Sequence, residues 1–219
     1  MPMSLCQYIG DGGNQKVHKG ISKIVSGMFA IVEMVDVVRI PPNRFNTNLK
    51  DAALAILKEK YESMISTELG YVIMIIDADV NPVGKVVHGD GSTYHKTRFS
   101  MLTFYPNLQE IVEGEVVEVT EFGAFVRIGP TDALLHLSQI IDDFLNVDVK
   151  QGMIVASKSN RVLRIGSTVR ARITAVSLKG GTMGKIGITC RQPFLGAEEW
   201  IREDVRKAEQ QRAKVEEAK

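Results

Sequence analysis

The sequence predicts an α+β protein that contains a small N-terminal α+β domain, a five-stranded barrel and a C-terminal helix. A segment with helical periodicity lies among strand-like runs before Pro106, five short strand-like runs follow Leu108, and a segment rich in helix formers follows Pro193. These changes of pattern divide the chain into an extension at residues 1–27, domains at 28–106 and 107–193, and a helical tail at 194–219. A chain of 219 residues can bury a core in each of two domains.

The composition is that of a folded protein without a strong charge bias. Hydrophobic residues make up 44% and charged residues 24%, and the formal net charge is +1, so a nucleic-acid contact would need a local basic patch. The two cysteines, Cys6 and Cys190, form no CxxC pair and predict neither a disulfide framework nor a zinc site. Because the sequence has no apolar run of about 18 residues and no signal peptide, we expect a cytoplasmic protein with no membrane contact.

The N-terminal domain is predicted from one helix and four strand-like runs. Before Met28 the polar stretch DGGNQKVHKG has no periodicity, which predicts a solvated extension. The run FAIVEMVDVVRIPP predicts a strand that ends at its double proline, and YVIMIID, VGKVVHG and TYHKTRFSMLTFYP predict three more. The helix follows a cap at Asn48, and its apolar face consists of Leu49, Ala53, Ile56, Leu57, Tyr61 and Met64.

The C-terminal domain is predicted from the runs IVEGEVVEV, FGAFVRI, DALLHLS, STVRARITAVS and KIGITCR. Glycine-containing turns separate these runs, apart from an insertion of about 25 residues between Ile141 and Ile165. Five strands at this spacing are typical of a small closed barrel of the oligonucleotide-binding type. The tail beyond the barrel is rich in helix formers and pairs opposite charges at i,i+4 spacing, which predicts a helix.

Two polar segments are candidates for sites of chemistry, and neither predicts an active site. Asp77 and Asp79 resemble carboxylates that share a magnesium ion, but they stand where a strand runs into an Asn-Pro turn. The loop from His88 to His95 places two histidines around Asp90, at a spacing that matches no metal-ligand pattern. No serine or cysteine has the setting of a nucleophile, so we predict no catalytic residue, metal or cofactor.

The segment FGAFVRI predicts a surface feature on the barrel. Strict alternation puts Phe122 in the core and Phe125 on the outer face, whereas Gly123 permits a bulge or bend that turns both rings outward. The sequence leaves these two alternatives open. With both rings exposed, they would form with His136 of the next strand a platform on which bases can stack.

Basic residues near these strands would supply the contacts to phosphate that the low net charge cannot. Arg170 and Arg172 are two residues apart and therefore share one face of their strand. The predicted RNA-contacting set comprises Phe122, Phe125, Arg127, His136, Arg170, Arg172, Lys179, Lys185 and Arg191.

The stretch GEVVEVTEFGAFVRIGPTDALLHLSQI combines a G-x-V opening, an FGAFV strand and an LLHLSQI return. In these features it resembles the S1 RNA-binding domain, and the resemblance extends over residues 108 to about 191. The resemblance implies a barrel that binds single-stranded RNA.

A longer set of stretches covers residues 28–204: VVRIPPNRF, GDGSTYHKTRF, LQEIVEGEVVEVTEFGAFVRIGP, SKSNRVLRIGSTVRARI and TCRQPFLGAEEWI. In this order they are similar to the family of the archaeal RNA polymerase E-prime protein, the counterpart of the seventh subunit of eukaryotic RNA polymerase II. The resemblance implies a non-catalytic stalk subunit with an RNP-like N-terminal domain, which forms a heterodimer with the smaller, helical F protein of the polymerase beside the RNA exit channel. It also implies contact with nascent RNA and roles in promoter opening, elongation and termination.

The same resemblance implies that the N-terminal domain docks on the polymerase core, near a loop that contains Gly89, Asp90, Gly91, Tyr94 and His95. One alternative is a freestanding S1 protein that regulates translation or RNA decay without polymerase. A second alternative is an enzyme that uses the Asp77 and Asp79 pair or the His88 to His95 loop.

Overall fold

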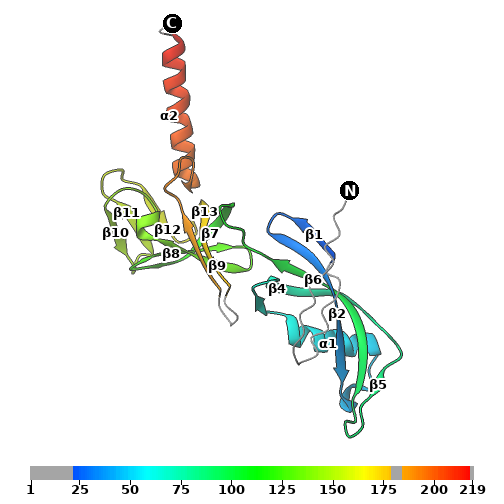
Figure 1. Ribbon diagram of the computed structural model, residues 1–219. Helices are drawn as coiled ribbons and strands as arrows, with labels where there is room; N and C mark the ends of the chain where they lie inside the picture. The colour runs from blue at the N-terminus through cyan, green and yellow to red at the C-terminus, as the bar shows by residue number, and fades with distance from the viewer. Residues whose placement is uncertain (1–21, 179–183, 218–219) are drawn as a thin grey trace, which may run out of the picture. The chain divides into compact units, whose positions relative to one another are not determined.

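The computed structural model describes residues 22–178 and 184–217, with side chains described from Gly27 to Gln210 within these ranges. The chain divides between Tyr105 and Pro106 into two compact units, each of which is described by itself. Figure 1 shows the elements of both units.

The N-terminal unit is built on an antiparallel sheet with the order β1-β2-β6-β4-β3. Strands β2 and β6 pair along their whole length, from Phe29 opposite Phe104 to Ile40 opposite Thr93. Strand β1 lies within the segment predicted to be an extension, and the strand predicted at VGKVVHG is reduced to the two residues of β5. The elements are β1 (Ser22–Ser26), β2 (Phe29–Ile40), η1 (Pro42–Arg44), α1 (Leu49–Tyr61), β3 (Ile65–Ser66), β4 (Gly70–Val80), β5 (Lys85–Val86) and β6 (Thr93–Phe104).

The core of this unit lies between helix α1 and one face of the sheet. Ala53 and Leu57 of the helix share one buried cluster with Phe99 and Met101 of β6, because the helical and strand periods each place apolar residues on the facing side. The side chain of Asn48 caps the helix by accepting a hydrogen bond from the backbone N–H of Lys50 at 3.4 Å.

The C-terminal unit contains the predicted five-stranded barrel. Its strands neighbour one another in the order β14-β9-β8-β7-β13, and pairing of β13 with β14 closes the barrel. Alternate residues fill the interior, among them Val116, Val126, Leu135, Ile173 and Ile188. The strands are β7 (Ile111–Thr120), β8 (Gly123–Ile128), β9 (Thr131–His136), β13 (Thr168–Ser177) and β14 (Lys185–Thr189).

The insertion between the third and fourth barrel strands is folded. It follows the short helix η2 (Leu137–Gln139) and forms a three-stranded antiparallel sheet of β10 (Leu145–Asp148), β11 (Met153–Ala156) and β12 (Val162–Arg164). The sequence patterns did not predict these strands. Ile154 and Leu163 pair across the sheet and are both buried, so the insert has apolar contacts of its own.

The chain ends in the predicted helix. Strand β15 (Gly196–Ala197) pairs with β13, and α2 (Glu198–Glu217) follows and projects from the barrel (Figure 1). Trp200 and Ile201 in its first turn are buried. Within the described ranges, neither helix is long and apolar enough to cross a membrane. The predicted α+β fold class, with its barrel and final helix, is confirmed.

Candidate nucleic-acid interface

The two phenylalanines of the FGAFVRI segment lie on the outside of the barrel. Phe122 belongs to the turn before β8 and is 49% exposed, and Phe125 is partly exposed on the outer face of β8. Their rings meet edge to face with centroids 6.2 Å apart. Because the strand begins at Gly123, the alternation that would bury Phe122 does not include it.

Gly123 permits this arrangement because it has no side chain where the backbone of β9 passes close to it. It pairs with His136 of β9, and a Cβ atom on Gly123 would lie 2.3 Å from the carbonyl oxygen of Leu135. No side chain fits at that distance. The pairing also brings His136 to the same end of the β8–β9 hairpin as Phe122.

His136 is exposed and is held in place by the short helix that follows it. Its Nδ1 atom lies 2.9 Å from the hydroxyl of Ser138, and the backbone N–H of Ser138 donates to the same nitrogen at 3.2 Å. The backbone N–H of Leu137 donates to the carbonyl of Phe122 at 3.1 Å. Phe122, Phe125 and His136 therefore form one group, which we call the aromatic platform.

The predicted basic residues do not form one rim around this platform. Arg127 lies on the outer face of β8, where its Nε atom donates to Asp132 at 2.9 Å, and this ion pair raises the pKa of Arg127. Arg170 and Arg172 share the outer face of β13, as strand alternation predicts. Arg170 donates from Nε to Glu113 of β7 at 2.8 Å.

Strand β7 separates the arginines of β13 from the aromatic platform. In the barrel it lies between β13 and β8, and its exposed outer residues include Glu113, Glu115 and Glu118. Glu118 is directly opposite Phe125. Sequence reasoning missed this acidic strand, although alternation in IVEGEVVEV places Glu113 and Glu115 on one face. Glu118 joins them on the outer face because the pairing of β7 with β8 shifts register between Val116 and Glu118.

The remaining cations lie toward β14, on the other side of the platform. Lys185 is exposed at the start of β14, which pairs with β9. Arg191 follows β14 and donates from Nη2 to Asp142 at 2.6 Å. Lys179 lies outside the described residues.

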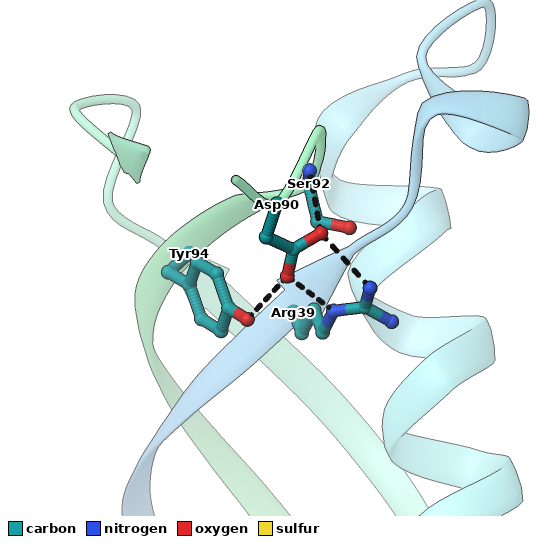
Figure 2. Close-up of polar contacts among 4 residues, drawn as sticks. All are labelled: Arg39, Asp90, Ser92 and Tyr94. Atoms are coloured by element: carbon teal, nitrogen blue, oxygen red, sulfur yellow. Dashed lines mark hydrogen bonds and ion pairs between the residues drawn. The ribbon is translucent and has the colours of Figure 1, made fainter. Parts of the chain in front are cut away.

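A second polar cluster lies in the N-terminal unit, around Asp90 (Figure 2). Arg39 of β2 donates from Nε and Nη2 to the two carboxylate oxygens of Asp90, each at 3.0 Å. The hydroxyl of Tyr94 on β6 donates to the same carboxylate at 2.6 Å, and the backbone N–H of Ser92 donates at 3.1 Å. Together these donors, Arg39 foremost, hold the pKa of Asp90 well below its ordinary value of 3.8.

The loop around Asp90 is therefore fixed to the sheet on both sides. Arg39 and Tyr94 face each other across β2 and β6, and Asp90 bridges them. Gly89 adopts a φ of +85°, a left-handed conformation that favours glycine. A Cβ on Gly91 would meet only the ring of Pro42, at 3.5 Å. The sequence did not predict this role of Arg39 in VVRIPPNRF, because its partner Asp90 is 51 residues away.

His95 is not part of the exposed loop. Its side chain is buried, and its Nδ1 atom lies 2.9 Å from the carbonyl oxygen of Asn81. A Cβ on Gly84 would lie 2.5 Å from the imidazole ring, so the segment before β5 packs directly on it. His95 therefore supports the segment before β5 from inside rather than presenting a contact surface.

The candidate residues for chemistry have structural contacts. Asp77 forms an ion pair with Lys50 of α1, in which Nζ lies 2.7 Å from Oδ1. Asp79 is opposite Arg98 in the pairing of β4 with β6. Among the described residues, no group of three or more histidine, cysteine, aspartate or glutamate side chains is placed to hold a metal ion. Burial raises the pKa of the Cys190 thiol to about 12.

Comparison with known proteins matches both units to described domains. The family model for the S1 RNA binding domain matches residues 105–183. The model for the SHS2 domain found in the N terminus of Rpb7p/Rpc25p/MJ0397 matches residues 35–91. The two units therefore define a class of protein in which an Rpb7-type N-terminal domain precedes an S1 barrel.

Relatives of this class align over most of the chain. The chain is 43% identical to DNA-directed RNA polymerase subunit Rpo7 of Saccharolobus shibatae, over 80% of this chain and 97% of that protein. It is 38% identical to subunit Rpo7 of Sulfolobus acidocaldarius, over 83% and 99%. DNA-directed RNA polymerase II subunit RPB7 of Saccharomyces cerevisiae is 24% identical, over 78% and 99%.

The chain belongs to the Rpo7 family of DNA-directed RNA polymerase subunits. The family predicted from the sequence is thereby confirmed, and so is the prediction of a polymerase subunit that is not an enzyme by itself.

Proposed function

We propose that this chain is a stalk subunit that docks on an archaeal RNA polymerase through its N-terminal unit and binds nascent single-stranded RNA on its barrel. It forms a heterodimer with the helical F protein of the polymerase and acts in the cytoplasm, where it supports promoter opening, elongation and termination. The observation that carries the RNA-binding role is the aromatic platform, with two exposed phenylalanine rings and His136 at one end of the β8–β9 hairpin.

The platform has the chemistry that single-stranded RNA requires. Every base has a flat face, so aromatic side chains stack on bases without regard to sequence, and nearby cations contact the phosphates. Lys185 and Arg191 lie on the β14 side of the platform. Arg127, Arg170 and Arg191 are each held by a carboxylate in the free chain, so their contribution to RNA binding would require those ion pairs to open.

The docking role is supported by apolar side chains beside the rigid Asp90 loop. Val83 and Val86 are 77% and 70% exposed, and Val87 is also exposed. Exposed apolar side chains in one short segment are unusual in a monomer and are typical of a surface that another protein covers. Arg39, Tyr94 and Asp90 hold the adjoining loop in one conformation, which lowers the entropy lost on docking.

The assembly can be tested by co-purification of the tagged chain from its native cell with a high-salt wash. Recovery of large polymerase subunits with a small helical partner is the expected result. Recovery of RNA or ribosomes without polymerase would favour the alternative, a freestanding S1 protein that regulates translation or RNA decay.

The RNA contact is tested by Phe125→Ala in the full chain. Loss of one stacked base costs about 1 to 3 kcal/mol, so we expect the affinity for single-stranded RNA to fall by roughly fivefold or more. Fluorescence anisotropy with a labelled oligonucleotide measures this change. Val149→Ala removes an exposed side chain that is not aromatic and should leave the affinity unchanged. Equal affinity of the Phe125→Ala and unmodified chains would contradict the proposed RNA surface.

A further inference from the structure

The insert carries an aromatic side chain that the platform does not include. Phe144 precedes β10 and is 74% exposed, although its neighbour Leu145 is partly buried. The ammonium group of Lys158 lies 5.3 Å from the centre of the Phe144 ring. An exposed ring with a cation beside it has the same chemistry as a base-stacking site with a phosphate contact.

Phe144 is held in place by its backbone rather than by burial of its ring. The carboxylate of Asp143 accepts hydrogen bonds from the backbone N–H groups of Phe144 at 2.7 Å, Lys158 at 3.0 Å and Ser159 at 2.9 Å. The backbone N–H of Ser157 donates to the carbonyl of Phe144 at 2.9 Å. The backbone segments that carry Phe144 and Lys158 are therefore held together, so little backbone entropy is lost when the two side chains bind a ligand.

The insert is attached to the barrel beside the aromatic platform. Helix η2 directly follows His136 and bonds to the carbonyl of Phe122, and the chain reaches Phe144 eight residues after His136. Arg191 bonds to Asp142, which joins the start of the insert to the end of β14. Arg191, through Asp142, and the Phe144–Lys158 pair therefore both belong to the part of the insert that follows the platform.

The direction from the platform across β7 toward β13 is unfavourable for RNA. Glu118 adjoins Phe125, and Glu113 and Glu115 continue the negative charge along β7. Phosphates on this side would meet exposed carboxylates before they reached Arg170. The β7 side of the platform therefore presents Glu115 and Glu118, whereas the β14 side presents Lys185 and the Arg191–Asp142 ion pair.

We propose that the RNA surface continues from the aromatic platform onto the insert, where Phe144 stacks on a base and Lys158 contacts a phosphate. This proposal rests on the proposed RNA-binding function and names a second contact for the same ligand. RNA that is long enough occupies both sites, and RNA that fits the platform alone occupies one.

The test compares two lengths of single-stranded RNA on the full chain. Barrels of this type occupy about 4 to 16 nucleotides, so labelled oligonucleotides of about 4 and about 16 nucleotides represent one site and both sites. We expect Phe144→Ala to weaken binding of the longer RNA by roughly fivefold or more and to leave the shorter RNA unaffected. Phe125→Ala should weaken both. Val149→Ala is the matched control in the insert and should change neither.

Lys158 gives an independent measurement. Lys158→Gln should reduce the slope of log affinity against log salt by about 0.7 for the longer RNA, as expected for one lost phosphate contact on a single strand. Equal binding of the longer RNA by Phe144→Ala and the unmodified chain would overturn the proposal while leaving the platform intact. If Phe144→Ala bound RNA normally but no longer co-purified with polymerase subunits, that result would also overturn the proposal and would assign Phe144 to a protein contact.

Discussion

Single residues decide which side chains of the barrel face solvent. Gly123 has no side chain, and so β8 can pass close to the carbonyl of Leu135 while the turn before it carries Phe122 outward. At Asp90, one carboxylate accepts from Arg39, Tyr94 and the backbone of Ser92, and thereby fixes a loop that has no regular secondary structure.

Gly123→Ala should destabilise the barrel. The added Cβ would lie 2.3 Å from the Leu135 oxygen, so strands β8 and β9 would have to separate, at a cost of about 1 to 3 kcal/mol. Urea denaturation measures the change in the free energy of unfolding. Gly187→Ala is the control, because its Cβ would meet Ala175 at an ordinary 3.5 Å. Equal loss of stability in both variants would contradict the close-contact explanation.

Arg39→Ala should raise the pKa of Asp90 toward 3.8, since Arg39 provides the largest contribution to its lowering. The folded-state pKa lies below 3.8, so the interactions of Asp90 stabilise the fold above that pH and are lost as the pH falls through the folded-state pKa. Carbon-13 shifts of the Asp90 carboxyl during acid titration report this pKa. Arg98→Ala removes an exposed arginine from the same strand as Tyr94 and should leave the titration unchanged.

Elements of the C-terminal unit are joined by a few contacts between distant segments. Arg161, next to β12, pairs with Asp204 of α2, and its guanidinium lies 5.6 Å from the centre of the Trp200 ring. Gly196 lies under the same ring, where an added Cβ would be 2.9 Å from a ring carbon. The insert therefore anchors the first turns of α2 to the barrel.

Arg161→Ala should loosen this anchor. Loss of the cation–π contact and the ion pair should lower the free energy of unfolding by about 1 to 2 kcal/mol. Trp200 is the single tryptophan of the sequence and is buried, so its fluorescence should shift to longer wavelength. Arg202→Ala breaks an exposed i,i+4 pair with Glu198 and should change stability by about 0.5 kcal/mol or less. Unchanged fluorescence in Arg161→Ala would show that the anchor lies elsewhere.

For the whole molecule, a net charge of +1 means that RNA binding depends on the local arrangement of charge. The acidic outer face of β7 and the cations near β14 and the insert lie on different sides of the platform. Long-range attraction of the whole chain for RNA is therefore small. We expect the salt dependence of RNA binding to reflect a few direct contacts between cations and phosphates.

We expect a shallow salt dependence for RNA binding by the full chain. The proposed surface contains three cations, Lys158, Lys185 and Arg191, of which Arg191 must first leave its ion pair with Asp142. Each phosphate contact on a single strand contributes about −0.7 to the slope of log affinity against log salt. The slope should therefore be about −2, as measured by titrations between low and high salt. A slope steeper than about −4 would require further cations, such as Arg170 and Arg172, and would contradict the proposed direction of the RNA.

The sequence by itself determined the family, the fold class, the five barrel strands and the helix face that contains Ala53 and Leu57. Residue periods and local motifs encode these features within short segments. The tertiary structure decided that Phe122 and Phe125 both face outward, that β7 separates Arg170 from them, and that Arg39 binds Asp90. It also revealed the sheet of the insert, whose strands are short. These features depend on contacts between residues far apart in sequence and on the order of strands around the barrel, which local patterns do not contain.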